Sequence, residues 1–258
     1  MQAGEYRRAL ALAAHIAGGH PDTPDGAALY AQLLDIGGLR EVAARVLPPQ
    51  AAQAAAPRFG PASPESAILP RDARVASSGV LVGDGRAALA SAAALRGAQR
   101  LWVRNGLGAL SAATLQRVDD LDLAVLLLEQ PLTATAAQLA PRDAHPGSAA
   151  FAVEYPAAAD ASPAWPALRA GFVGKPIAGT KAGRLGIDLP PGPRGGPVFD
   201  AAGRLCGIAV SGERLLPVSF LRPQIAGSNR EAADGVKLNA EEIYERSLGV
   251  TLQVIVVP

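Results

Sequence analysis

The side chains that most often perform chemistry in proteins are few and scattered in this sequence. Its three histidines, His15, His20 and His145, lie far apart, and Cys206 is the single cysteine. One cysteine permits no internal disulfide, and no spacing of cysteine and histidine is typical of a metal site. The sequence therefore predicts neither a bound metal nor another cofactor.

A glycine-rich segment and an acidic segment carry the remaining candidates. Residues 192–200 read Gly-Pro-Arg-Gly-Gly-Pro-Val-Phe-Asp, and residues 119–122 read Asp-Asp-Leu-Asp before an apolar run. A carboxylate can orient a catalytic partner. Arginine stays protonated and is not a nucleophile, so the glycine-rich segment offers no attacking group of its own.

The elements that must position these two segments are predicted to be strands. From about residue 74, short runs rich in Val and Leu alternate with Gly, Pro and Asp turns. Many short strands with frequent turns favour a sandwich or a barrel. An Ala-rich stretch at residues 87–96 is expected to be a short helix. The apolar runs are residues 80–82, 101–103, 123–128, 150–153, 197–199 and 205–210.

Residues 1–49 are predicted to form a separate helical module. Apolar residues recur at helical spacing over residues 4–47, and paired glycines at 18–19 and 37–38 divide the stretch into three helices. Small residues such as Ala9 and Ala43 are 34 positions apart, which resembles the tetratricopeptide repeat (TPR). An ordinary three-helix bundle is the alternative. Residues 50–72, rich in proline and alanine, are predicted to be a semi-extended linker.

Five segments of the β-rich part follow the motif order of one family. Residues 77–82, Ser-Ser-Gly-Val-Leu-Val, are similar to its opening Gly-Ser-Gly strand. Residues 88–98 are similar to Val-Leu-Thr-Asn-Ala-His-Val-Val-x-Gly-Ala, and residues 119–126 to Thr-Asp-Leu-Ala-Leu-Leu. Residues 192–200 resemble Gly-Asn-Ser-Gly-Gly-Pro-Leu, and residues 216–219 resemble Ile-Pro-Val-Ser before a terminal helix. Together they resemble the trypsin-like serine proteases of the HtrA/Deg branch.

This resemblance implies a mainly β fold, with two six-stranded barrels over residues 73–258 and an active site in the cleft between them. In such proteases a serine attacks the carbonyl, a histidine accepts its proton and an aspartate orients the histidine. The matching positions hold Arg194, Ala93 and Asp122. Alanine cannot accept a proton, so the resemblance implies an inactive pseudoprotease. A buried carboxylate needs a partner, so Asp122 is expected to pair with Arg194 or with backbone N–H groups.

The vestigial cleft is expected to bind rather than to cut. Gly192, Arg194 and Gly195 would form its anion-binding turn, although the glycines could serve the turn alone. Asp188, six residues before Arg194, could accept a basic side chain or lie in a surface turn.

Three functions stay open on this reading. The first is a protein- or peptide-binding scaffold, because strand addition survives loss of the triad. The second is a residual serine hydrolase with a shifted nucleophile, at Ser91 or Ser211. The third is a purely structural domain of a larger assembly.

Composition narrows the partners further. The net charge of +1 gives no reason to expect nucleic acid, and no apolar run is long enough for a membrane span. The first residues do not resemble a signal peptide. We therefore expect a cytoplasmic protein, or a periplasmic one if an upstream signal has been removed, as in bacterial HtrA-like proteins.

The C-terminal residues predict a displaced strand. Residues 239–247 read as a helix with an asparagine cap, and residues 250–257 form a β-branched run. We expect residues 251–257 to fill a slot in the first barrel, because an unpaired strand this apolar would aggregate. The pairing could be made within the chain, as a circular permutation, or between chains, as in a strand-swapped homo-oligomer. The alternative is the start of a second domain.

Overall fold

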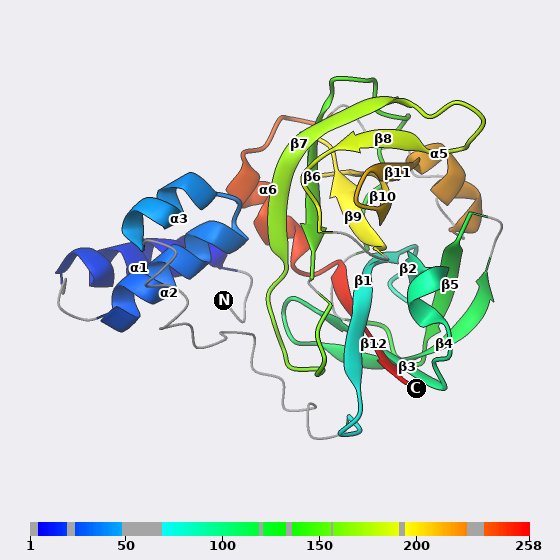
Figure 1. Cartoon of the computed structure of the whole chain (residues 1–258), viewed down its shortest axis with the longest axis horizontal. Coiled ribbons are helices and arrows are strands. Elements are labelled where there is room, and N and C mark those ends of the chain that lie inside the picture. The colour runs from blue at the N-terminus through cyan, green and yellow to red at the C-terminus, as the bar shows by residue number, and fades with distance from the viewer. Residues whose placement is uncertain are drawn as a thin grey trace.

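Two β-barrels and a helical module make up the molecule (Figure 1). The computed structural model describes residues 5–19, 24–47, 69–118, 121–132, 136–155, 157–190, 194–225 and 235–258. Both barrels are closed and each has six strands. The mainly β, double-barrel fold implied by the sequence is therefore confirmed.

The first barrel has the strand order β1-β12-β3-β4-β5-β2. All its neighbouring strands are antiparallel. Its strands are β1 (Arg74–Val82), β2 (Ala87–Ser91), β3 (Arg100–Asn105), β4 (Leu110–Val118), β5 (Leu123–Leu128) and β12 (Thr251–Val257).

Strand β12 lies between β1 and β3, far from both in sequence. It pairs Thr251 with Val80 on one side and Leu252 with Asn105 on the other. The capped helix expected before it is present as α6 (Ala240–Ser247), where Asn239 forms a capping box. The prediction that the C-terminal strand completes the first barrel is confirmed, and the pairing is made within one chain.

Strand β12 is buried on both faces, which explains why all of its residues except Thr251 and Gln253 are apolar. Its outer face is covered by the segment that connects β6 and β7. Arg104 Nη1 donates to Ala161 O (2.8 Å) and to Gln253 Oε1 (3.2 Å). Gln253 Nε2 donates to Ser162 O at 3.1 Å. A connection of the second barrel thus closes over the first.

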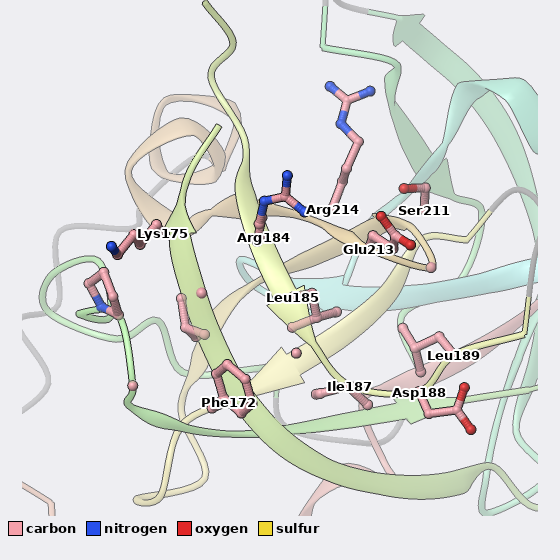
Figure 2. Close-up of a pocket in the computed structure, with 16 residues that line it drawn as sticks. Phe172, Lys175, Arg184, Leu185, Ile187, Asp188, Leu189, Ser211, Glu213 and Arg214 are labelled. Atoms are coloured by element: carbon pink, nitrogen blue, oxygen red, sulfur yellow. The ribbon is translucent and has the colours of Figure 1, made fainter. Parts of the chain in front are cut away.

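The second barrel has the order β10-β11-β8-β7-β6-β9. Its long strand β7 curves alongside β8, with which it pairs, and the Phe172 ring on β7 lies over Gly186 of β8 (Figure 2). A short helix, α5 (Val218–Leu221), and a 3₁₀ turn, η3 (Arg222–Gln224), follow the barrel. The strands are β6 (Ala149–Glu154), β7 (Ala167–Pro176), β8 (Gly183–Gly186), β9 (Gly196–Phe199), β10 (Leu205–Ser211) and β11 (Arg214–Pro217).

The helix expected at residues 87–96 is wrong. The stretch forms strand β2 and then a 3₁₀ turn, η2 (Ala92–Leu95). Strand β2 pairs with β1 and with β5, and Ala88, Leu89 and Ala90 are fully buried. Pairing on both sides overrides the high intrinsic helix propensity of alanine, because tertiary contacts outweigh local propensity.

Three helices precede the barrels, as the sequence predicted, at α1 (Tyr6–Gly19), α2 (Pro24–Ile36) and α3 (Arg40–Val46). Tyr6 of α1 is fully buried, donates to Leu33 O and packs edge-on against Tyr244 of α6, with ring centroids 4.8 Å apart. Arg7 forms an ion pair with Glu245 of α6. The module is therefore docked on the helix that leads into β12. The expected linker lies mostly outside the described residues.

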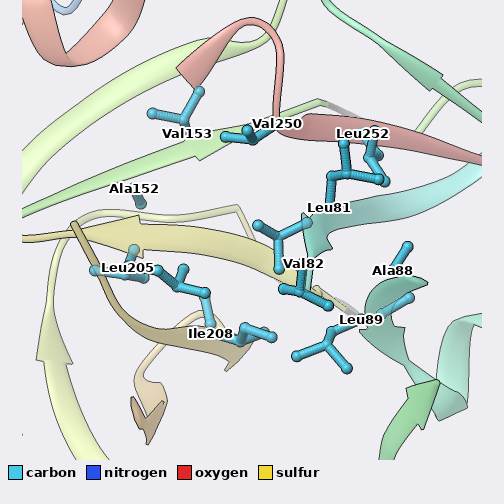
Figure 3. Packing of buried hydrophobic residues seen from close by; sticks show 14 of the residues in the cluster. Leu81, Val82, Ala88, Leu89, Ala152, Val153, Leu205, Ile208, Val250 and Leu252 are labelled. Carbon is cyan, nitrogen blue, oxygen red and sulfur yellow. The ribbon is translucent and has the colours of Figure 1, made fainter. Parts of the chain in front are cut away.

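One hydrophobic cluster runs through both barrels. Leu81 and Leu252 of the first barrel belong to the same cluster as Val153 and Ile208 of the second (Figure 3). The hydroxyl of Ser78 on β1 also accepts a hydrogen bond from Tyr155 N, at 2.8 Å, immediately after β6. The junction between the barrels is therefore continuous core, and side chains within it have little freedom.

Replacing Leu252 with Ala should test how far the first barrel depends on β12. Leu252 is 0% exposed, so the change should lower the free energy of unfolding by about 2–5 kcal/mol. Leu127→Ala on β5 is the matched control because Leu127 is 47% exposed. Urea unfolding should find the control within about 1 kcal/mol of the wild type. Equal losses from the two variants would contradict the placement of β12.

Candidate functional site

Arg194, at the position that the resemblance gives to the nucleophile, lies buried in the barrel junction. Its Nη1 is 2.9 Å from Glu154 Oε2, and its Nη2 donates to Pro190 O. Arg194 is 7% exposed and Glu154 is 3% exposed. The Arg194 side chain therefore points into the protein interior, where Glu154 neutralises its charge.

The prediction that Arg194 pairs with Asp122 is wrong. Strand β6 pairs with β9, so Glu154 at the end of β6 lies against the turn that leads into β9. A Cβ added to Gly196 would meet Glu154 Cγ at 2.5 Å. The carboxylate on the neighbouring strand therefore reaches Arg194, and Asp122 belongs to the other barrel.

Glu154 was missed by the sequence reasoning, which ended its strand at Val153. The available signal was a charged residue directly after the apolar run of residues 150–153. Burial raises the pKa of Glu154 to about 7, and the nearby Arg194 charge lowers it by a smaller amount. Its Oε1 is buried and accepts no hydrogen bond from the described residues. The ion pair thus compensates only part of the cost of burying this carboxylate.

Asp122 has a side-chain donor in place of the expected arginine or backbone groups. Ser91 Oγ donates to Asp122 Oδ2 at 3.1 Å, and Ala92 N donates to Asp122 O at 2.9 Å. Asp122 also has a positive φ of 59°, a conformation that aspartate tolerates better than most residues. Ala93 follows in η2 and brings no proton acceptor. Ser91 is fully buried, so it offers no accessible nucleophile.

Gly195 shapes the turn between Arg194 and β9. Its φ is +121°, and an added Cβ would meet Ser78 O at 2.5 Å and Ser91 N at 2.7 Å. Its N–H donates to Ala209 O at 2.7 Å. Gly195 therefore permits the second barrel to approach the first, and its N–H is already used. The expectation for Gly192 lies outside the described residues.

An open groove of about 1080 Å³ runs beside the junction on the second barrel. Its floor is apolar, and Phe172 is 53% exposed within it (Figure 2). Asp188, which the sequence offered as a binding residue, is exposed and borders this groove, as does Ser211. Ser211 forms no hydrogen bond with a histidine or a carboxylate in the described part of the chain. The groove therefore combines an apolar floor with an exposed aromatic ring.

A smaller hollow of about 430 Å³ lies between the barrels, beside Asp122. Lys181, on the connection between β7 and β8, and Arg214 of β11 border it from the second barrel. Arg214 also borders the groove. The smaller hollow and the groove thus share Arg214 as a lining residue.

The remaining reactive residue types lie elsewhere. His145 and Cys206 border a third hollow, which is lined by residues 140–145 and by the turn between β9 and β10. Burial raises the pKa of the Cys206 thiol to about 12, and a buried thiol with a raised pKa is a poor nucleophile. Among the described residues, histidine, cysteine and carboxylates form no group that could hold a metal ion. None of the described helices is long and apolar enough to cross a membrane.

Comparison with known proteins agrees with this geometry. Residues 77–208, just over half of the chain, match the family described as the trypsin-like peptidase domain. No curated protein sequence matches the chain.

Three solved structures are similar in fold. The HtrA-type protease AlgW with decapeptide is 21% identical, with a TM-score of 0.48, over 56% of this chain and 49% of its own. The MamO protease domain from Magnetospirillum magneticum is 20% identical, with a TM-score of 0.46, over 60% of this chain and 90% of its own. Deg5 is 20% identical, with a TM-score of 0.43, over 56% and 79%. The match thus spans about half the length of AlgW.

Removing the cation of the buried pair should be more damaging than removing both charges. At about pH 8, where Glu154 is mostly ionised, Arg194→Met should lower the free energy of unfolding by about 3–5 kcal/mol. The double variant E154M/R194M should recover most of that loss because no uncompensated charge remains. Urea unfolding of both variants gives the comparison. If the double variant is as unstable as R194M, the unpaired Glu154 carboxylate is not the cause of the instability of R194M.

The raised pKa of Glu154 predicts a specific pH dependence. The folded chain binds this proton more tightly than the unfolded chain, with pKa values of about 7 and 4.5. The stability that Glu154 contributes is therefore complete below about pH 4.5 and is lost as the pH rises through about 7. Relative to Glu154→Gln, the wild type should lose on the order of 3 kcal/mol across this window.

Urea unfolding of both proteins at intervals across the same pH range measures this difference directly. Glu129→Gln, at an exposed position, is the control for removal of a carboxylate that is not buried. A constant difference between wild type and E154Q would contradict the burial of an ionisable group at this position.

Proposed function

Because the chain belongs to the trypsin-like peptidase domain family, and because Ala93 and Arg194 stand where that family's base and nucleophile are expected, we propose that it is a non-proteolytic, peptide-binding member. The observation that supports this proposal most is the buried ion pair with Glu154, which holds Arg194 at the position expected for the nucleophile. An arginine held in an ion pair is neither a nucleophile nor a proton acceptor.

The groove on the second barrel supports binding of an extended segment. It is bordered by strands β7 and β8 and by the turn between β10 and β11. An apolar floor with a half-exposed aromatic ring is typical of a site that anchors a bulky side chain. Binding of this kind needs no triad, so it is compatible with the loss of the base and the nucleophile.

Two measurements on the intact chain test the proposal together. A fluorophosphonate probe should not label the protein, and casein should stay uncut, because neither Ser91 nor Ser211 is activated. In fluorescence anisotropy, labelled decapeptides rich in Val and Leu should bind, and Phe172→Ala should weaken that binding about tenfold. Leu127→Ala, an exposed change on the other barrel, should leave it unchanged.

The absence of proteolysis and the binding of peptides can each be contradicted separately. Labelling or turnover that disappears in Ser91→Ala or Ser211→Ala would establish the residual hydrolase. An absence of decapeptide binding to the wild type would favour a structural domain. Thermal melting of Phe172→Ala separates loss of the anchor from loss of the fold, because the ring also covers Gly186.

A further inference from the structure

Two arginines face each other across neighbouring strands at one end of the groove. In the antiparallel pair of β8 and β11, Arg184 is directly opposite Arg214. Residues in this relation have side chains on the same face, with Cβ atoms about 5 Å apart. Both side chains border the groove and extend toward the top of the view in Figure 2.

Neither arginine forms an ion pair with a carboxylate in the part of the chain that the structure describes. Glu213, which precedes Arg214 in the turn, is not paired with it in this part of the chain either. Like charges directly opposite in a sheet repel each other. A carboxylate bound between the two guanidinium groups would remove that repulsion and could accept several charge-assisted hydrogen bonds.

The surroundings of the pair describe the rest of the ligand. Leu185, Ile187 and Leu189 continue from the arginine end along the groove, with Phe172 beside them. We propose that the groove selects a peptide segment in which an acidic side chain, bound by Arg184 and Arg214, is followed by a bulky apolar side chain that lies on Phe172. This inference rests on the proposed peptide-binding function and specifies its ligand.

The other charges of the groove favour a peptide over a polyanion. Asp188 lies four residues beyond Arg184 along the chain, and it borders the groove together with Glu213. Lys175 borders the groove as well, so three cations and two carboxylates line it. These carboxylates would repel the next phosphate of a nucleic acid or the next headgroup of an anionic membrane. A single acid in an otherwise uncharged segment meets no such repulsion. The net charge of +1 also gives little long-range attraction for a polyanion.

The test uses the intact chain and a matched set of labelled decapeptides. Each peptide is a Val- and Leu-rich decapeptide with a single substitution. The substituted residue is Glu, Gln or Lys, and it is placed at each of the positions in turn. In fluorescence anisotropy, Glu should bind about tenfold more tightly than Gln at one or two adjacent positions. This advantage should shrink as the salt concentration rises. The variant R184Q/R214Q should lose the advantage while it still binds the Gln peptide.

Control variants make the interpretation specific. Arg86→Gln removes an exposed arginine from the first barrel and should leave the Glu advantage intact. R184E/R214E should instead prefer the Lys peptide at the same positions. Because Arg184 and Arg214 are exposed, all variants should melt close to the wild type.

The outcomes separate this inference from the proposed function. Equal binding of Glu and Gln peptides at every position would overturn the acidic preference and leave peptide binding standing. Failure of all decapeptides to bind would overturn both. A single-stranded oligonucleotide, or vesicles containing phosphatidylserine, that bound more tightly than every peptide and lost binding in R184Q/R214Q would assign the arginines to a different class of partner.

Discussion

The ion pair between Arg194 and Glu154 is the constraint on which the rest of the site depends. Two opposite charges lie out of water at the junction of two barrels, and each makes the other necessary. The guanidinium also donates to Pro190 O, so it links Pro190, which follows β8, to the residues that lead into β9. Arg194, at the position that the resemblance gives to a nucleophile, thus makes structural contacts with both neighbouring segments. Surfaces available to a ligand lie beside it, on the outer side of the second barrel.

The same junction joins parts of the chain that are distant in sequence. Gly195 lets the second barrel approach Ser78 and Ser91 of the first, while the segment after β6 covers β12 through Arg104 and Gln253. Helix α6 contacts the N-terminal module through Tyr244 and continues into β12. The helical module, α6 and both barrels are therefore connected by direct contacts. A shift of α6 would displace β12 in the first barrel.

Local pattern predicted most of the fold, and the site was predicted only in part. Short apolar runs with turns predicted a sandwich or a barrel, and the family resemblance implied the two barrels. The apolar residues 251–257 were predicted to pair because an unpaired strand this apolar would aggregate. The Ala-rich β2 was missed because its pairing partners, rather than its own residues, decide its conformation.

The partner of Arg194 was out of reach for a related reason. Glu154 belongs to no motif, and the pairing of β6 with β9 brings it to the arginine across 40 residues of chain. The three positions that the resemblance gives to a catalytic triad could be located from the motifs. The contacts that their residues make depend on packing between strands, and a linear pattern does not record packing.

The place of β12 has a consequence for how the chain reaches this structure during synthesis. Strands β1 and β3 leave the ribosome early, yet the strand that lies between them emerges after all the strands of the second barrel. The second barrel can close while the first still exposes two long edges. Contacts of such wide sequence separation form slowly, and open edges in a nascent chain invite pairing with other chains. Nascent-chain protection by a chaperone would thus matter most for the half of the protein that is translated first.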